Sequence, residues 1–319
     1  MLGGLHGCRS SPILSPGMGG IIYSTLTRRG LLLASIWLGL AGAACKTAPP
    51  AGGRIRLVDD AGDTVRLAAP AHRVVSLIPA STELLFAIGA GSTVVGRTSY
   101  CDYPPAAKSV PDLGDGIRPS IEAVLGQRPD LVVVYNSGQN AVIAERLRAL
   151  GIPSLRINTD ALADVGRVAR ILGTLTGHER GADSVASVFD TALAAATRPL
   201  ESGRPKVLLL VWEQPPMTIG RGSFLHELVE RAGGENLFAD VSASSGVVSI
   251  EAVAARNPDL IFTTTEGPAA FASRPEWQVV RAVREHRFLR VSGSEFNRPS
   301  PRAPAAIREL TAKLGSRRP

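Results

Sequence analysis

An internal repeat constrains the fold of this chain more than any other feature. The segment SIEAVLGQRPDLVVV at 120–134 returns as SIEAVAARNPDLIFT at 249–263, with eight of fifteen positions identical and a constant offset of 129 residues. Each copy has a serine in the N-cap position, a short helical pattern, a proline that ends it and an apolar run typical of a buried strand. A chain of 319 residues that contains this unit twice is expected to form two similar lobes.

Strand and helix patterns alternate around both copies. Before the first copy, residues 54–70 alternate like a hairpin with Asp and Gly at its turn, and 74–78 form a buried-strand run that leads into a helix. The order returns in the second half, where the expected elements are strand 206–212, helix 223–234, strand 288–293 and helix 300–314. This alternation predicts the α/β class, with parallel-type sheets in both lobes.

The residues between the two halves predict helix. From 162 to 200 apolar residues recur at helical spacing, although Gly173, Gly177 and Gly181 would weaken the helix and favour a break near Thr176. The expected organisation is an N-terminal lobe at 54–160, one long rigid linking helix at 161–202 and a C-terminal lobe at 203–319. Because a single helix resists hinge bending, little lobe closure is expected.

The N-terminal segment, residues 1–45, predicts export. Residues 28–45, RRGLLLASIWLGLAGAAC, place two arginines before an apolar stretch and small residues, which is the layout of a secretory signal. TRRGLLL resembles a twin-arginine signal, with Sec export as the alternative, and either Met1 or Met18 is the true start. The run that ends at Cys45 resembles a lipoprotein cleavage box, with plain cleavage as the alternative, and residues 46–53 would form a tether. The protein is therefore expected in the periplasm or on the outer face of the cytoplasmic membrane.

Composition and motifs argue against several classes of function. The net charge of +7 comes from basic residues spread along the chain, without the clustered stripe that follows a nucleic-acid backbone, so nucleic-acid binding is not expected. The three cysteines form no CxxC pair and only five histidines are present, so no metal site is predicted. GxSxG, HExxH and GK[ST] motifs are absent from the sequence. An exported enzyme of unknown reaction is therefore the runner-up to a binding protein, with a structural envelope protein third.

Aromatic residues gather in loops that follow the expected strands. Aromatic residues make up 5% of the chain, and Tyr100, Tyr103, Tyr135, Trp212 and Phe296 all lie in such loops. Strand ends and helix N-termini converge where two α/β lobes meet, so these loops are expected to face a ligand cleft. The alternative for each ring is packing beneath its own loop.

Several segments, taken together, resemble the periplasmic cobalamin-binding proteins. In chain order they are RVVSLIPASTELLFAIGAGSTVVGRTSYCDYPPAAKSVPDLG, IEAVLGQRPDLVVV, ERAGGENLFAD, IEAVAARNPDLIF and FNRPSPRAPAAIREL, and they span about 54–314. That family belongs to the substrate-binding proteins that serve ABC importers of metal chelates (cobalamin, ferric siderophores, haem). The resemblance implies two lobes bridged by one long helix, a chelate as ligand and a dimeric ABC permease in the cytoplasmic membrane as partner. It also implies a monomer with no resident cofactor.

The resemblance further implies a set of ligand-binding residues drawn from both lobes: Pro79, Ala80, Tyr100, Gly116, Tyr135, Trp212, Phe296, Asn297 and Arg298. Gly116 and Ser245 depart from the family, because cobalamin binders can carry tryptophan there. One second-lobe disulfide of some relatives is also impossible, since Ala232 replaces a cysteine.

Cobalamin is accordingly the first expectation, and two other chelates stay open. An anionic ferric siderophore would be expected to use arginines, for which Arg118, Arg221 and Arg298 are available. Haem would be expected to use an axial Tyr or His, for which Tyr100 is available. Cys101 is expected to be a small loop residue, with contact to a metal chelate as the alternative.

Glu122 and Glu251 occupy the third position of the two repeat copies. A carboxylate in the first turn of a helix is favourable against the helix dipole, which would suffice for either residue alone. In the family that the chain resembles, a glutamate on the outer face of each lobe matches an arginine pocket on each half of the permease dimer. The resemblance therefore implies that this pair docks the permease, outside the ligand cleft.

Overall fold

The computed structural model describes residues 55–116, 119–198, 203–264 and 269–316. The predicted export signal, the tether, Cys45 and Arg118 lie outside these residues. No described helix is long and apolar enough to cross a membrane.

The first lobe is built on a parallel sheet whose four strands lie in the order β4 (Val94–Arg97), β3 (Val74–Ser76), β5 (Leu131–Tyr135) and β6 (Ser154–Ile157). Three helices belong to this lobe, namely α1 (Pro79–Ala87), α2 (Ile121–Gly126) and α3 (Gly138–Ala149). The predicted hairpin at 54–70 is confirmed as β1 (Ile55–Val58) and β2 (Thr64–Leu67), which form their own two-stranded sheet. Helix α3 and strand β6 were not predicted from the sequence.

The second lobe has a mixed sheet in the order β10, β8, β7, β11, β12, with β9 beside β7. Its strands are β7 (Lys206–Glu213), β8 (Pro216–Ile219), β9 (Glu235–Asn236), β10 (Ser245–Val247), β11 (Leu260–Thr263) and β12 (Phe288–Arg290). Its helices are α6 (Phe224–Arg231), α7 (Ile250–Arg256), α8 (Arg281–Arg284) and α9 (Ala303–Gly315). Strands β7, β11 and β12 pair in parallel, as predicted. The sequence did not predict β9, which pairs in parallel with β7, or β8 and β10, which add an antiparallel edge.

Short 3₁₀ helices interrupt the loops of both lobes, at Gly91–Thr93, Pro105–Ser109, Ala270–Ser273, Pro275–Val279 and Ser294–Phe296. The last of these directly precedes residues 297–299 in the loop between β12 and α9.

The sequence repeat is confirmed as a structural repeat. Helices α2 and α7 begin 129 residues apart, and so do strands β5 and β11. The hydroxyl of Ser120 accepts the Ala123 N–H at 3.2 Å, and that of Ser249 accepts the Ala252 N–H at 3.1 Å, so each serine is the expected N-cap. Both helices also end alike, because the residue before each proline takes a left-handed conformation: Arg128 with φ 48° and Asn257 with φ 50°.

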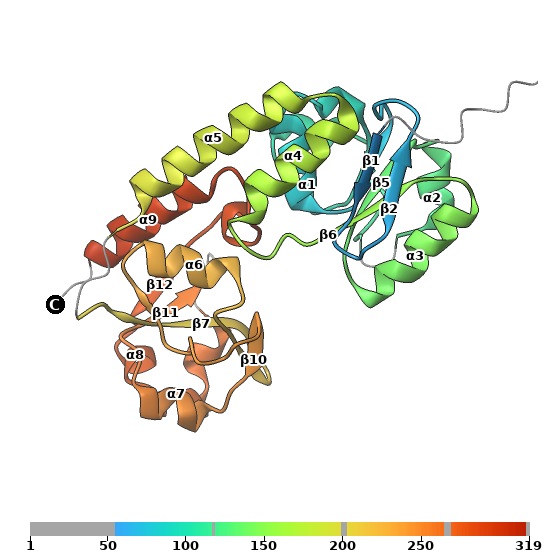
Figure 1. Ribbon diagram of the computed structural model, residues 1–319. Helices are drawn as coiled ribbons and strands as arrows, with labels where there is room; N and C mark the ends of the chain where they lie inside the picture. The colour runs from blue at the N-terminus through green and yellow to red at the C-terminus, as the bar shows by residue number, and fades with distance from the viewer. Residues whose placement is uncertain (1–54, 117–118, 199–202, 265–268, 317–319) are drawn as a thin grey trace, which may run out of the picture. The chain divides into compact units, whose positions relative to one another are not determined.

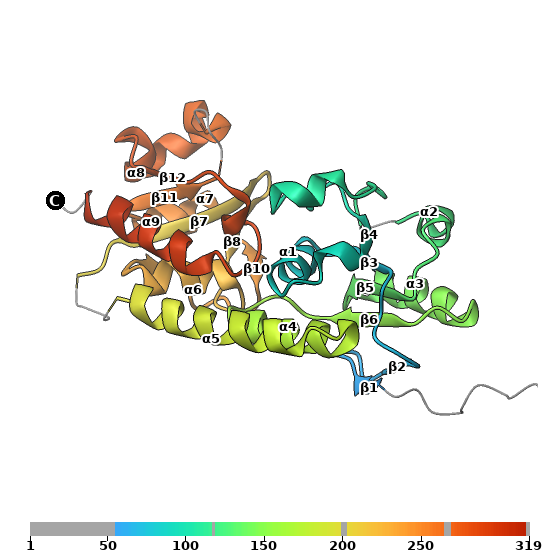
Figure 2. The same cartoon turned by 90° about the horizontal axis from the view of Figure 1, so that it is seen from above.

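The segment predicted as one linking helix is two helices. Helix α4 (Asp164–Thr176) ends at Gly177, which has φ 72°, and α5 (Glu179–Ala196) begins two residues later. The two helices pack side by side, and α5 extends to the second lobe, where it packs against α9 (Figures 1 and 2). A Cβ on Gly181 would lie 2.1 Å from the carbonyl oxygen of Ile88, so this glycine lets α5 approach the end of α1. The single bridging helix is therefore α5 alone.

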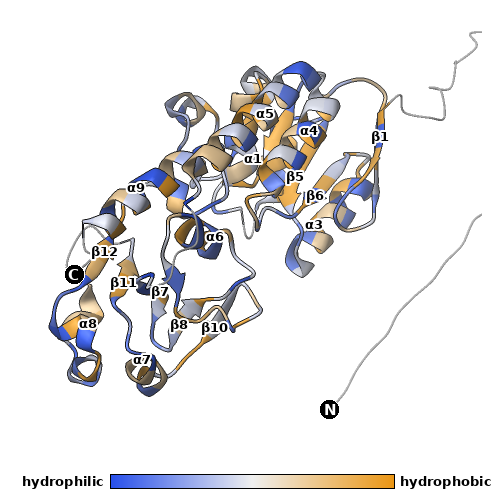
Figure 3. Ribbon diagram, turned by 60° about the vertical axis from the view of Figure 1, so that its left-hand side comes forward, coloured by the Kyte–Doolittle hydropathy of each residue, from blue (hydrophilic) through white to orange (hydrophobic). Residues whose placement is uncertain are grey.

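One apolar cluster connects the two sheets through the linking helices. It includes Val133 of the first sheet, Leu172 of α4, Phe189 of α5, Phe262 of the second sheet and Leu310 of α9. In Figure 3 the hydrophobic colour runs along the central strands, whereas the helices alternate between hydrophobic and hydrophilic residues. Since buried side chains pack at crystal-like density, this shared core opposes independent movement of the lobes.

Candidate functional site

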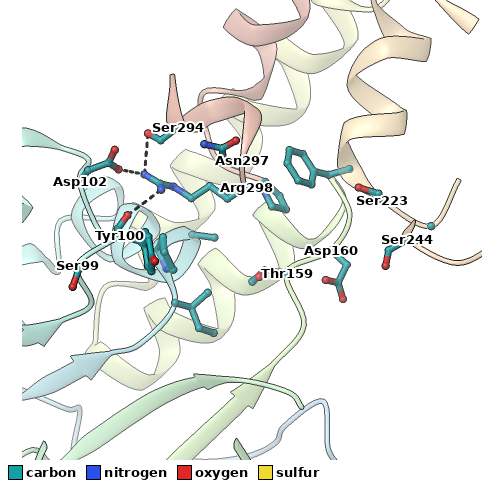
Figure 4. A pocket seen from close by; sticks show the side chains of 16 residues that line it. Ser99, Tyr100, Asp102, Thr159, Asp160, Ser223, Ser244, Ser294, Asn297 and Arg298 are labelled. Carbon is teal, nitrogen blue, oxygen red and sulfur yellow. Dashed lines mark hydrogen bonds and ion pairs between the residues drawn. The ribbon is translucent and has the colours of Figure 1, made fainter. Parts of the chain in front are cut away.

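A cavity of about 580 Å³ is lined by sixteen residues from both lobes. They are Ile78, Pro79, Ala80, Ser99, Tyr100, Asp102, Thr159, Asp160, Gly222, Ser223, Phe224, Ser244, Ser294, Asn297, Arg298 and Pro299. Most of these residues follow strands β3, β4, β6 and β12 or lie at the N-termini of α1 and α6, where a ligand site between two α/β lobes is expected, and Ser244 directly precedes β10. Figure 4 shows Tyr100 and Asp102 on one side, Asp160 and Ser244 on the other, and Arg298 between them.

Five residues predicted to bind the ligand lie together in this cavity. They are Pro79, Ala80, Tyr100, Asn297 and Arg298. Tyr100 is 62% exposed and lines the cavity, so its aromatic ring is available to a ligand. Residues that the sequence predicted in both lobes therefore lie at one cavity.

Gly116 and Phe296 do not line the cavity. A Cβ on Gly116, whose φ is 76°, would lie 2.6 Å from Thr98 Cγ2, so this glycine permits close packing behind the loop. Phe296 is buried, and its ring meets the edge of Phe262 with centroids 6.3 Å apart. The prediction that Phe296 forms the pocket wall is wrong because the ring packs into the core beneath its own loop.

Tyr135 and Trp212 also lie outside the lining. The Tyr135 hydroxyl donates to Asp160 Oδ1 at 2.8 Å, so Tyr135 positions a residue that does line the cavity. Burial, and then the hydrogen bond to Asp160, raise the pKa of Tyr135 to about 12, and this phenol stays protonated at neutral pH. Trp212 is 61% exposed, and its indole N–H donates to the Gln214 carbonyl at 2.9 Å.

The sequence missed several polar residues of the lining, above all Asp102, Thr159, Asp160, Ser223 and Ser244. Ser223 carried a signal as the N-cap of α6, and its hydroxyl accepts the Leu225 N–H at 3.3 Å. Thr159 and Asp160 had none, because they follow the unpredicted strand β6.

A cluster of five charged residues joins the lobes at the cavity wall; the cross-lobe cluster consists of Glu83, Asp102, Glu295, Arg298 and Arg302. Arg298 Nε donates to Glu83 Oε2 at 3.2 Å, and its Nη1 donates to the Tyr100 carbonyl at 3.1 Å. Its Nη2 donates to Asp102 Oδ1 and, at 3.1 Å, to the Ser294 hydroxyl. All three nitrogens of Arg298 are therefore engaged.

Arg302 completes the cluster through Glu83 and Glu295. Its Nε donates to Glu83 Oε1 at 2.6 Å, and its Nη1 donates to Glu295. The guanidinium lies over the Tyr103 ring, 4.0 Å from the centroid, in a cation–π arrangement. Glu83, whose side chain is 2% exposed, thus accepts hydrogen bonds from both arginines.

The balance of charge changes the role expected of Arg298. Three carboxylates and two guanidinium groups leave the cluster with one excess negative charge. Burial raises the pKa of Asp102, but the hydrogen bond and the charge of Arg298 outweigh it and lower that pKa below its ordinary value. Arg298, which the sequence offered as an anion-binding group, is already paired inside the cluster. Arg221 is exposed and is not among the lining residues.

Cys101 is fully buried and does not line the cavity. Its sulfur accepts the Thr82 hydroxyl at 3.1 Å and lies 3.2 Å from the Thr98 hydroxyl. Within the part of the chain that the structure describes, no group of three or more His, Cys, Asp or Glu side chains is placed to hold a metal ion.

Glu122 and Glu251 lie on the surface, outside the cavity lining. Both are exposed in the first turn of their helices, and Glu122 accepts the Ser120 hydroxyl at 2.9 Å. A hydrogen bond from its own backbone, followed by one from the cap serine, lowers the pKa of each carboxyl, so both are ionised at neutral pH. Glu122 itself lines a surface hollow of about 460 Å³, together with Pro119, Ser120, Ile121, Gln139, Ile143 and Arg146.

Comparison with known proteins places the chain among binding proteins. The family described as periplasmic binding protein matches residues 74–293. The vitamin B12-binding protein of Vibrio cholerae serotype O1 is 28% identical over 247 residues, which cover 77% of this chain and 90% of that protein. The uncharacterized ABC transporter substrate-binding lipoprotein YvrC of Bacillus subtilis is 29% identical over 269 residues, covering 81% and 84%.

A solved structure agrees with these relatives. The periplasmic heme-binding protein RhuT from Roseiflexus sp. RS-1, in apo form, matches with a TM-score of 0.69 and 26% identity over 77% of this chain and 99% of that chain. All of these are binding proteins by name, which confirms the expectation of a binding protein rather than an enzyme. Since the family match spans more than half of the chain, the protein belongs to the periplasmic binding protein family.

Proposed function

We propose that this protein is the extracytoplasmic substrate-binding protein of an ABC importer and that its ligand is a corrinoid such as cobalamin. The observation that carries the proposal is the composition of the cavity wall: an exposed aromatic ring, several uncharged hydrogen-bonding groups and an arginine whose charge is already paired. The vitamin B12-binding protein of Vibrio cholerae, similar over most of both chains, supports the same ligand class.

A corrinoid suits this wall because it is a broad ring with amide side chains and little net charge. Tyr100 offers a flat apolar face to the ring. Six uncharged polar side chains offer partners to the amides, namely Ser99, Thr159, Ser223, Ser244, Ser294 and Asn297. Among the described lining residues the charged ones are Asp102, Asp160 and Arg298, which disfavours a strongly anionic chelate such as a ferric siderophore.

Haem is the second candidate, because Tyr100 also carries an exposed phenol. A tyrosine oxygen is one of the axial ligands that proteins supply to haem iron. The structural similarity to a heme-binding protein supports this candidate as well. The haem propionates, however, would face a wall whose charge is negative.

Variants of Tyr100 distinguish the two ligands by absorption titration with cyanocobalamin and with haemin. For a corrinoid, Tyr100→Phe should keep the dissociation constant within about twofold, whereas Tyr100→Ala should raise it about tenfold through loss of the ring. The control is Trp212→Ala, which removes an exposed aromatic residue outside the cavity lining. It should change the dissociation constant for neither cyanocobalamin nor haemin. A tyrosinate–iron spectrum that Tyr100→Phe abolishes would replace the corrinoid with haem, and the absence of binding by both would refute the proposal.

We also propose that the mature chain is anchored through a lipid on Cys45, as the name of the similar protein YvrC suggests for that relative. In cells that process lipoproteins, the wild-type protein should fractionate with membranes and its N-terminal peptide should carry the mass of an acylated cysteine. Cys45→Ser should move the protein to the soluble envelope fraction. A mature N-terminus without acyl mass would indicate plain peptidase cleavage instead.

Docking to the permease is proposed to use Glu122 and Glu251. Their equivalence by the repeat offset, their exposure and their ionised state support contact with two equivalent cationic pockets on a two-fold symmetric partner.

A further inference from the structure

Asp102 covers the only guanidinium of the described cavity lining. The carboxylate of Asp102 and the side chain of Arg298 both line the cavity, and they meet through Arg298 Nη2 (Figure 4). Asp102 follows Tyr100 in the loop after β4, whereas Arg298 comes from the second lobe.

The partners of Arg298 differ in how well a ligand can reach them. Glu83 is 2% exposed, and the Arg298 side chain itself is 10% exposed. The Asp102 side chain is 46% exposed. Asp102 is the acidic partner of Arg298 that lines the cavity, so an anionic group of a ligand would compete with it for the guanidinium.

We propose that Asp102 is a specificity-determining residue: its carboxylate occupies the anion position on Arg298, so the cavity admits neutral chelates and rejects those that carry carboxylates. This inference deepens the proposed function, because it names the charge class that the same cavity selects. It concerns selection by charge and does not depend on which ring system binds.

Displacement of Asp102 brings no net gain to an anionic ligand. The ligand would exchange one carboxylate on Arg298 for another, and the displaced Asp102 would remain nearby as a like charge. Asp160 adds a second negative charge to the wall. A neutral ligand leaves the Asp102–Arg298 pair intact and meets no such repulsion.

The test compares two pairs of probes that differ chiefly in carboxylate charge: cyanocobalamin against its monocarboxylate, and haemin dimethyl ester against haemin. The wild-type protein should prefer the neutral member of the pair that it binds. Asp102→Asn retains an oxygen that accepts from Arg298 and removes one negative charge. It should raise the affinity for the charged member relative to the neutral one by about tenfold, with the affinity for the neutral member within about threefold.

Asp160→Asn is the matched control, because it removes the same charge from the same cavity without touching the Arg298 pair. Its effect on the charged-to-neutral ratio should be clearly smaller. An equal effect would assign selection to the overall charge of the cavity, and an unchanged ratio in Asp102→Asn would show that Asp102 has no selective role; either result overturns the inference.

The two proposals fail in different ways. If only the haem pair binds and Asp102→Asn shifts its ratio, the corrinoid proposal fails and the inference stands. If the corrinoid pair binds and Asp102→Asn leaves the ratio of its charged and neutral affinities unchanged, the proposed function stands and the inference fails. If no probe binds, both fail. If Asp102→Asn lowers the affinity for both members of a pair equally, Asp102 is a purely structural link between the lobes, which also contradicts the inference.

Discussion

Replacing Glu122 and Glu251 together by alanine is expected to reduce uptake of the ligand by more than tenfold while leaving its affinity for the purified protein unchanged. Both carboxylates are exposed and ionised, and they stand at equivalent positions of the repeat. Neither lines the ligand cavity, so their removal should spare binding. Uptake of labelled ligand by cells and titration of the purified variant measure the two quantities separately.

A double variant of two other exposed glutamates, Glu145→Ala with Glu276→Ala, is the matched control for this experiment. It removes the same charge from surface positions that the repeat does not relate, and uptake should stay near the wild-type level. Each single variant, Glu122→Ala or Glu251→Ala, should give an intermediate loss. Normal uptake by the double variant would refute docking through this pair, and thermal unfolding will reveal whether the carboxylates act only as helix caps.

The parts of the fold that the sequence predicted are those specified by local interactions. The caps Ser120 and Ser249 satisfy backbone groups within three residues, and the apolar runs after Pro129 and Pro258 can only be buried. The strands that were missed depend on distant partners. In β8, Met217 lies opposite Trp212 on one side and Val247 on the other, and neither contact is visible as a period in the sequence.

The candidate site shows the same limit. Loops after strands correctly located Tyr100 and Arg298 at the cavity. Whether a loop aromatic faces a ligand or the core depends on what lies beneath it, and Phe296 finds Phe262 there. The charge of Arg298 looked available because its partner Glu83 is 215 residues away in the chain. Only the fold brings that carboxylate to the arginine.

Glu83→Ala is expected to produce the largest loss of stability in the cross-lobe cluster, about 3–5 kcal/mol in the free energy of unfolding. Glu83 is buried and accepts hydrogen bonds from both Arg298 and Arg302, whose side chains are 10% and 20% exposed. Its removal would leave two poorly solvated guanidinium groups without their shared partner, and buried charges that lose a partner are costly. Urea unfolding followed by circular dichroism measures the difference.

Two further variants separate charge from volume and from position. Glu83→Gln keeps the size and one acceptor oxygen, so a loss of about 2 kcal/mol or more there would assign the effect to the missing charge. Glu295→Ala removes a carboxylate that contacts Arg302 alone within the cluster, at 21% exposure, and should cost about 1 kcal/mol. If Glu83→Gln unfolds like the wild type, the arginines do not depend on this carboxylate, and the shared apolar core alone holds the lobes together. If Glu83→Gln unfolds at lower urea concentration than the wild type, the ion pairs that neutralise Arg298 also fix the cavity wall in place. This follows because Arg298 donates to the Tyr100 carbonyl as well.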